Sequence, residues 1–130
     1  MQIAKNLGAE VTAVDSGIKE EMLRSIGADH FIDYTKEDFT QRNERYDVIL
    51  NSVAHASYTG CINALNPNGR YLIANPQLSN MLRAPITSRF TDKQAIFTLA
   101  GEKEEELLAL KDMIEAGKIR PVVDKIYTMD

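Results

Sequence analysis

The chain has 130 residues and a formal net charge of −4 at pH 7, with 44% hydrophobic and 26% charged residues. This length predicts a single domain over residues 1–130. The acidic balance argues against a nucleic-acid or membrane-surface binder, because phosphate contacts need clusters of basic residues. No apolar run approaches the roughly 20 residues that a membrane-spanning helix needs.

The single cysteine, Cys61, excludes an internal disulfide and suits a reducing compartment. Nothing after Met1 resembles a signal peptide, so we expect a cytoplasmic protein. Cys61, His30 and His55 do not have the spacing of a metal cluster, and no zinc site is predicted.

The first part of the chain alternates apolar strands with helices. The pattern predicts the end of a helix over residues 1–7, a strand over 10–15, a helix over 18–26, a strand over 30–34 and a short helix over 35–43. Gly8 and Gly27 suit the left-handed backbone that closes a helix. The helix over 18–26 should bury one apolar face, made of Ile18, Met22, Leu23 and Ile26.

The second part continues this alternation. It predicts a strand over 46–51, a helix over 57–65, a turn over 66–69 and a strand over 70–74. A loop over 77–89 and a strand over 94–99 follow. The chain then continues with a helix from 102 that Gly117 ends, and with an extended segment over 119–129. The strand over 46–51 is apolar enough to be buried on both faces. The buried helix faces should consist of Cys61, Ile62 and Leu65 in one helix and of Leu107, Leu110 and Ile114, with Leu108 and Met113, in the other.

Strands that are separated by helices, rather than by two-residue hairpins, pair in parallel through right-handed crossovers. The repeated strand–helix unit therefore predicts the α/β class, as a doubly wound parallel sheet. Ligands of such sheets bind at the carboxyl ends of the strands, so candidate site residues are expected where strands end.

Six segments in a fixed order carry a family resemblance. They include LNPNGRY at 65–71 and IEAGKIRP at 114–121, and the others lie at 2–11, 23–30, 32–39 and 46–49. In this order and spacing the chain resembles the cofactor domain of medium-chain dehydrogenases/reductases, in the zinc-independent, quinone oxidoreductase-like branch. The resemblance covers nearly the whole chain.

The resemblance implies a Rossmann-like domain that lacks its usual first, central strand. In the family, the segment at 2–5 ends a helix whose start carries a glycine-rich loop, and a separate catalytic domain completes the chain. No G-x-G-x-x-G run occurs here, so we expect a truncated nucleotide-binding domain without the catalytic domain. The strands at 10–15 and 46–51 would lose their common neighbour. We expect the sheet to close up, or a homodimer to complete it through exposed strand edges. The alternative is a sheet whose edges are simply open, which ranks lower because unpaired buried backbone groups are costly.

Asp15 ends the first predicted strand, where an acidic residue binds the adenosine ribose 2′-hydroxyl of NAD. By resemblance, Ser16, Lys19 and Tyr34 approach the 2′-phosphate of NADP. Because a phosphate repels a carboxylate and attracts an ammonium group, Asp15 favours NAD, whereas Lys19 and Tyr34 favour NADP. The resemblance tips the prediction towards NADP. The alternatives are a helix N-cap at Asp15 and Ser16, and a solvated surface charge at Lys19.

Asn51 and Val53 follow the strand at 46–51, in the loop that in the family lies under the nicotinamide ribose. Asn51 and Ala54 stand where the family has an acidic residue and a glycine. Asn75, after the next strand, is a further candidate on the same edge. His55 has a pKa suited to proton transfer, but no nucleophile or carboxylate partner lies nearby in sequence, so no catalytic residue is predicted.

Three functions are compatible with these features. The first is a cofactor-domain fragment of an oxidoreductase that transfers hydride from NAD(P)H to a quinone or carbonyl-type acceptor. Such a fragment should be inactive alone, because it lacks the pyrophosphate-binding loop and the catalytic domain. The second is a non-catalytic remnant or interaction module from a truncated gene. A Rossmann-type methyltransferase is a distant third, since it too needs a glycine-rich loop.

Overall fold

The computed structural model describes residues 1–53, 56–97, 101 and 103–128, and the chain folds as two compact units. Unit 1 comprises Met1–Glu37 with Glu102–Asp130, and unit 2 comprises Asp38–Gly101. All strand pairs in the described residues are parallel, as predicted. The α/β class with parallel pairing is therefore confirmed, and each unit is described by itself.

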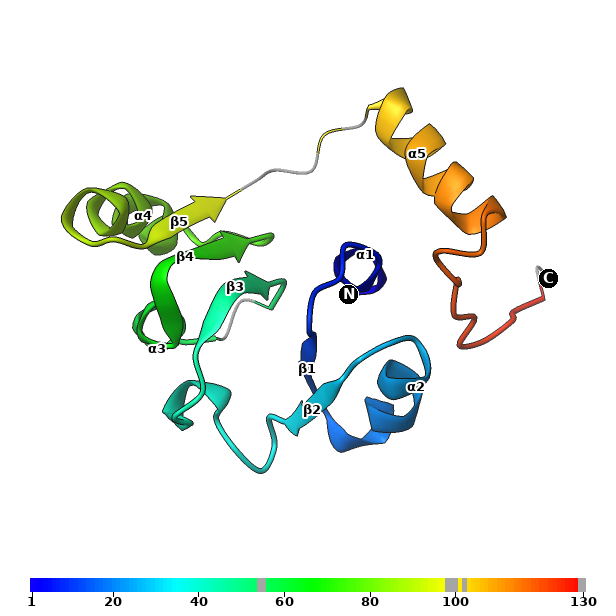
Figure 1. Ribbon diagram of the computed structural model, residues 1–130, viewed down its shortest axis with the longest axis horizontal. Helices are drawn as coiled ribbons and strands as arrows, with labels where there is room; N and C mark the ends of the chain where they lie inside the picture. Colours follow the sequence, from blue (N-terminus) through cyan, green and yellow to red (C-terminus); the bar gives the residue numbers. More distant parts are fainter. Residues whose placement is uncertain (54–55, 98–100, 102, 129–130) are drawn as a thin grey trace. The chain divides into compact units, whose positions relative to one another are not determined.

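Unit 1 contains a two-stranded parallel sheet and its connecting helices (Figure 1). Its elements are α1 (Gln2–Asn6), β1 (Thr12–Asp15), the 3-10 helix η1 (Gly17–Lys19), α2 (Glu20–Ser25), β2 (His30–Asp33) and α5 (Glu104–Glu115). Strands β1 and β2 run in register from the pair Thr12 and His30 to the pair Asp15 and Asp33. The two strands therefore end side by side, each on an aspartate.

The helix ends in unit 1 follow the predicted glycines. Gly8, Gly27 and Gly117 have φ angles of +83°, +110° and +70°, in the left-handed region that closes a helix. Lys5 of α1 lies 2.7 Å from the Asp29 carboxylate, which also accepts the Val11 N–H at 2.7 Å. This carboxylate joins α1 to the segments that enter β1 and β2.

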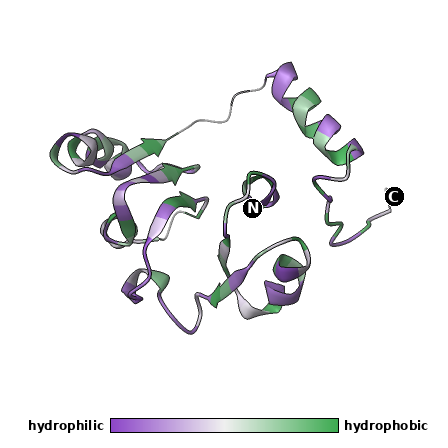
Figure 2. Cartoon of the chain, viewed as in Figure 1, coloured by the Kyte–Doolittle hydropathy of each residue, from purple (hydrophilic) through white to green (hydrophobic). Residues whose placement is uncertain are grey.

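The apolar faces predicted for two helices of unit 1 are wrong in part. Ile18 is 96% exposed, because it lies in η1 before α2 begins, whereas Met22, Leu23 and Ile26 are half-buried. On α5, apolar and polar residues alternate as Figure 2 shows, yet the predicted inner residues are exposed, namely Leu107, Leu108, Leu110 and Ile114. An amphipathic pattern identifies the apolar face of a helix, but whether that face is buried depends on what packs against it.

Unit 2 contains a three-stranded parallel sheet in the order β3-β4-β5. Its elements are the 3-10 helix η2 (Phe39–Gln41), β3 (Tyr46–Asn51), α3 (Tyr58–Asn63), β4 (Leu65–Ile73), α4 (Leu78–Phe90) and β5 (Gln94–Phe97). In Figure 1 the three strands lie side by side, with α3 beside β4 and α4 beside β5. Their shared core includes Cys61 and Ile62 of α3 and Leu65, which begins β4 rather than ending the helix as predicted.

Helix α4 covers a stretch that the sequence predicts as a loop, and that prediction is wrong. Pro85 lies inside α4, where it cannot donate a backbone hydrogen bond. Packing in unit 2 compensates for this loss. Ala84 is 2% exposed, the Thr87 hydroxyl lies 2.9 Å from the Tyr58 hydroxyl, and Ser88 Oγ accepts a hydrogen bond from β5 at 3.2 Å. Tertiary contacts therefore outweigh weak local propensity here.

Strand β3 is buried on one face only, so the prediction of two buried faces is wrong. Ile49 is 9% exposed, whereas Val48 and Leu50 are 53% and 64% exposed. The predicted turn at 66–69 lies within β4, as an irregularity. The register jumps there from the pair Tyr46–Leu65 to the pair Val48–Arg70, while Asn68 takes a φ of +62°.

The sheet does not close up among the described residues. There β1 is hydrogen-bonded to β2 alone and β3 to β4 alone, so each keeps one open edge. The doubly wound order places another strand between β1 and β3, and each unit keeps the pairs that its own crossovers build. Direct pairing of β1 with β3 is therefore not seen in the described residues, and completion of the sheet by a second copy stays a prediction.

Candidate functional site

The six predicted site residues fall into two groups, each at the carboxyl end of a strand. Asp15, Ser16, Lys19 and Tyr34 lie at the ends of β1 and β2 in unit 1. Asn51 and Val53 lie at the end of β3 in unit 2. The fold thus gathers four of them within one unit.

The Asp15 carboxylate organises the first group. It accepts the Ser16 N–H at 2.7 Å, and Lys19 Nζ lies 3.2 Å from both of its oxygens. Burial, the largest single influence, would raise the pKa of Asp15. The hydrogen bonds from Ser16 and Lys19 outweigh it and lower that pKa below the ordinary value. Asp15 is therefore held as an anion at the end of β1.

The alternative hypothesis, that Asp15 and Ser16 form a helix cap, agrees with the structure only in part. Ser16 is the residue before η1, but its side chain makes no cap hydrogen bond there. The acceptor at this position is Asp15, which binds the N–H of the next residue. Lys19 likewise is more than a solvated charge, because at the end of η1 it forms an ion pair with Asp15 at the end of β1.

Tyr34 lies beside this pair. Its backbone N–H donates to the Asp15 carbonyl oxygen at 3.2 Å, and its side chain is 61% exposed. The backbone of Tyr34 is thus joined to the strand end that carries the Asp15–Lys19 pair, and its exposed phenol adds a flat surface and a hydroxyl to the same edge of the sheet. Such a set can bind a sugar hydroxyl or a phosphate.

Asp33 is a neighbour that the sequence analysis missed. It is the register partner of Asp15, and its side chain is only 12% exposed. Hydrogen bonds from the Thr35 hydroxyl, at 2.6 Å, and from the Thr35 N–H lower the pKa of Asp33, with Lys36 adding to the effect. The signal was available, because both predicted strands contain an aspartate near the end and carboxyl ends of parallel strands meet.

Gly17 marks a close approach at the same edge. A Cβ atom on Gly17 would lie 2.6 Å from Asp33 Oδ2, closer than real Cβ contacts come. The absence of a side chain at Gly17 therefore lets the second carboxylate lie against the turn that follows β1. A side chain at Gly17 would have to displace the Asp33 carboxylate from this turn.

The second group is built on the Asn51 amide. Asn51 Oδ1 accepts the Val53 N–H at 3.0 Å, while Asn51 Nδ2 donates to the Tyr71 hydroxyl at 2.9 Å. Val53 is 61% exposed. Ala54 and His55, named in the sequence analysis, lie outside the described residues.

Two searches of the described residues complete the inventory. In that part of the chain, no three His, Cys, Asp or Glu side chains are close enough to hold a metal ion. No helix there is long and apolar enough to cross a membrane. The expectation of a zinc-free, cytoplasmic protein stays a prediction.

Parallel strands joined by helices, with an acidic residue at the end of the strand before η1, define a Rossmann-type cofactor domain. A family model described as zinc-binding dehydrogenase matches residues 26–130. The chain belongs to this family, in the quinone oxidoreductase-like part of the medium-chain dehydrogenase/reductase superfamily.

Named relatives agree with this family. The chain is 31% identical over 126 residues to 2-methylene-furan-3-one reductase of Solanum lycopersicum, covering 95% of this chain and 29% of the relative. It is 28% identical over 152 residues to the mitochondrial NAD(P)H oxidoreductase RTN4IP1 of Mus musculus, covering 98% and 38%. The chain thus spans only about a third of the length of these relatives.

A solved structure gives the same fold. The quinone oxidoreductase from Coxiella burnetii superposes with a TM-score of 0.80 at 22% identity, over 95% of this chain and 38% of that one. Since the identity is this low, the match supports the Rossmann-type fold and says nothing about the ligand.

Proposed function

We propose that the chain is the nicotinamide-dinucleotide-binding part of a reductase that transfers hydride to a quinone, an enone or another carbonyl-type acceptor. The observation that carries this proposal is the Asp15–Lys19 pair beside Tyr34 at the carboxyl edge of β1 and β2. Relatives that are named as NAD(P)H oxidoreductases and furanone reductases give it further support.

In this proposal unit 1 binds the adenosine half of the cofactor. The Asp15 side chain is 31% exposed, so its carboxylate can accept a further hydrogen bond from a ribose hydroxyl. Lys19 and the exposed ring of Tyr34 would hold a 2′-phosphate, with the Ser16 hydroxyl as an additional donor. We propose NADP as the preferred form, because a phosphate dianion competes well with a single carboxylate for Lys19.

The family resemblance makes the turn from Asn51 to Val53 in unit 2 a separate candidate contact for the nicotinamide ribose. The bound cofactor supplies the hydride, and the residues of this chain supply position. We propose that the chain does not turn over substrate by itself, since it spans about a third of its relatives. A non-catalytic interaction module is the competing function, and cofactor binding separates the two.

The direct test is a calorimetric titration of the purified chain with NADPH and, separately, with NADH. We expect saturable binding of both, with NADPH the tighter ligand. Equal, unsaturable heats for both nucleotides up to millimolar concentration would contradict the proposal and favour the interaction module. Adenosine 2′,5′-bisphosphate as a third titrant isolates the contribution of unit 1, because it lacks the nicotinamide half.

We also propose that two copies pair through their exposed strand edges. Both β1 and β3 are hydrogen-bonded on one side only in the described residues, and β3 exposes Val48 and Leu50. Such edges tend to pair with another chain. Light scattering after size exclusion should give a dimer mass, and Val48→Lys with Leu50→Lys should shift it to the monomer. Leu107→Lys, on an exposed site of α5, is the matched control, and a monomeric parent protein would refute the pairing.

A further inference from the structure

The Tyr71 hydroxyl is a buried polar group that accepts a hydrogen bond from the side chain of Asn51. Tyr71 is 0% exposed and lies in β4, the middle strand of the unit 2 sheet. Burying a hydroxyl is costly unless it is hydrogen-bonded. Here Asn51 Nδ2 donates to Tyr71 Oη at 2.9 Å, across the neighbouring strands β4 and β3. The contact fixes the Asn51 side chain to the core.

The other end of the same amide reaches the surface. Asn51 Oδ1 accepts the Val53 N–H at 3.0 Å, and this bond from a side chain to the backbone two residues on forms an Asx turn. The two bonds also fix the orientation of the amide, because an N–H requires an oxygen acceptor and leaves Nδ2 facing Tyr71. A continuous path therefore leads from a fully buried ring to the exposed backbone at Val53.

The buried end of this path is rigid. The Tyr71 ring packs edge-on against Tyr58, with centroids 5.5 Å apart, and both it and Cys61 are fully buried in the same core. Burial raises the pKa of Tyr71 well above its ordinary value, so the hydroxyl keeps its proton. Close packing of this kind restricts the movement of a buried ring.

We propose that Tyr71 is a positioning residue, which acts through Asn51 to hold the turn at Val53 in the shape that receives the nicotinamide half of the cofactor. This inference rests on the proposed function for its ligand, but its structural step stands on the two hydrogen bonds alone. Tyr71 touches no ligand in this account, and a loss of its hydroxyl leaves the ring, and thus the packing, in place.

The test compares Tyr71→Phe with Tyr58→Phe. Each variant removes one hydroxyl from the same pair of packed tyrosines, but Tyr58 bonds to Thr87 and not to Asn51. Amide hydrogen exchange at Val53, followed by NMR, should accelerate about fivefold in Tyr71→Phe, the effect of one lost hydrogen bond. Tyr58→Phe should leave it unchanged. Equal exchange in wild type and Tyr71→Phe would overturn the proposal, as would equal acceleration by both variants.

Two Asn51 variants sharpen this result. Asn51→Ala removes both bonds and should accelerate exchange at Val53 at least as much as Tyr71→Phe does. Asn51→Asp should restore slow exchange, because one carboxylate oxygen still accepts the Val53 N–H and the other accepts the Tyr71 hydroxyl proton. Failure of the aspartate to restore slow exchange would show that the path to Tyr71 is not what holds the turn.

Calorimetric titration of the same proteins with NADPH separates this inference from the proposed function. We expect Tyr71→Phe to weaken binding about fivefold, while Tyr58→Phe binds like wild type. Equal affinity of Tyr71→Phe and wild type would refute the positioning role and leave the proposed function intact. Absence of binding by wild type would refute the proposed function, and the exchange experiment would still decide whether Tyr71 holds the turn.

Discussion

Replacing Ile32 by alanine is expected to destabilise unit 1 by about 2–5 kcal/mol, the range for removing a buried isoleucine side chain beyond its first carbon. Ile32 is 0% exposed and lies in β2, where it is the register partner of Val14 in β1. The substitution leaves a cavity between the sheet and its covering helix. Since folded domains are stable by only about 5–15 kcal/mol, this loss should be visible as a lower midpoint in urea unfolding.

Ile18→Ala is the matched control. It deletes the same atoms in the same unit, but Ile18 is 96% exposed, so the free energy of unfolding should change by less than about 0.5 kcal/mol. Comparing Ile32→Ala with Ile18→Ala also tests whether Ile18 is buried, as the helical pattern predicts, or exposed, as the structure has it. A helical pattern alone places Ile18 on the buried face with Met22 and Ile26, and comparable losses from both substitutions would favour that pattern over the observed burial.

The sequence was most informative where local chemistry decides the structure. The bounds of β3 agree residue for residue with the prediction, because Tyr46–Asn51 is a short apolar run between polar segments. The glycines that end three helices were also predicted correctly, because the left-handed backbone that closes a helix is a local requirement. The acidic strand end at Asp15 was likewise visible, because strand and terminus could both be assigned locally.

The failures concern features that depend on what packs against an element. Helix α4 has no clear periodicity and contains Pro85, so only its contacts with β5 and Tyr58 explain why it is helical. Val48 and Leu50 look like residues of a fully buried strand, and their exposure shows that the face of β3 opposite Ile49 is not covered. Asp33 was missed because the two predicted strand ends were considered separately, whereas the parallel register of β1 and β2 makes it the partner of Asp15.

The two-unit organisation has the same origin. In a doubly wound sheet the first strand lies between the strands that correspond here to β1 and β3, and it pairs with both. Without hydrogen bonds from such a strand, each half retains the parallel pairs that its own crossovers build. The given sequence contains no G-x-G-x-x-G run, but how its strands pair is a question of tertiary structure, which composition and periodicity do not address.

Lys19→Ala is expected to weaken NADPH binding at least about 10-fold while changing NADH binding less than about twofold. The first figure corresponds to roughly 1.4 kcal/mol, at the low end of what a charge-assisted hydrogen bond to phosphate contributes. In the free protein Lys19 is paired with Asp15 at 3.2 Å, and its side chain is 53% exposed, so it can turn to a 2′-phosphate without disturbing the core. NADH has no 2′-phosphate, and its ribose hydroxyl would bind Asp15.

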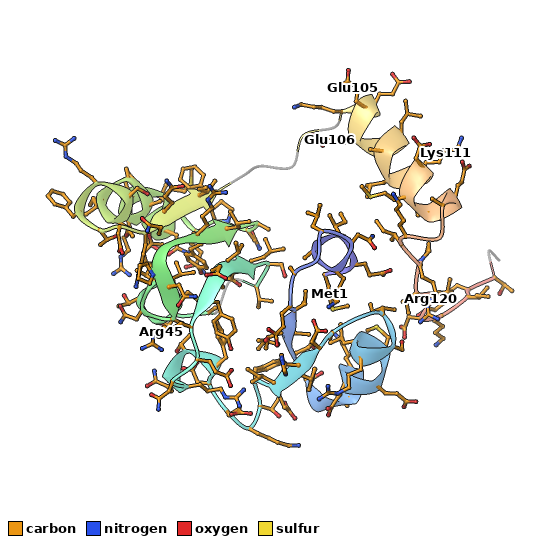
Figure 3. The ribbon with its side chains drawn as sticks, in the orientation of Figure 1. Met1, Arg45, Glu105, Glu106, Lys111 and Arg120 are labelled. Atoms are coloured by element: carbon orange, nitrogen blue, oxygen red, sulfur yellow. The ribbon has the colours of Figure 1, made fainter. Side chains whose placement is uncertain are left out.

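Lys111→Ala provides the matched control for charge. Lys111 lies on α5, further along the helix than Glu105 and Glu106 (Figure 3), and forms an ion pair with Glu115 at 3.7 Å across one helical turn. Its side chain is 64% exposed, against 53% for Lys19. Both variants change the net charge by the same amount, so a general electrostatic effect would weaken NADPH binding equally in each. The Lys19 effect should also shrink as salt rises from 50 to about 500 mM, because screening weakens an exposed ion pair. If Lys19→Ala instead lowered the affinities for NADH and NADPH alike, the role of Lys19 would be to hold the η1 turn in place through its ion pair with Asp15. Any preference for the 2′-phosphate would then have to come from other residues.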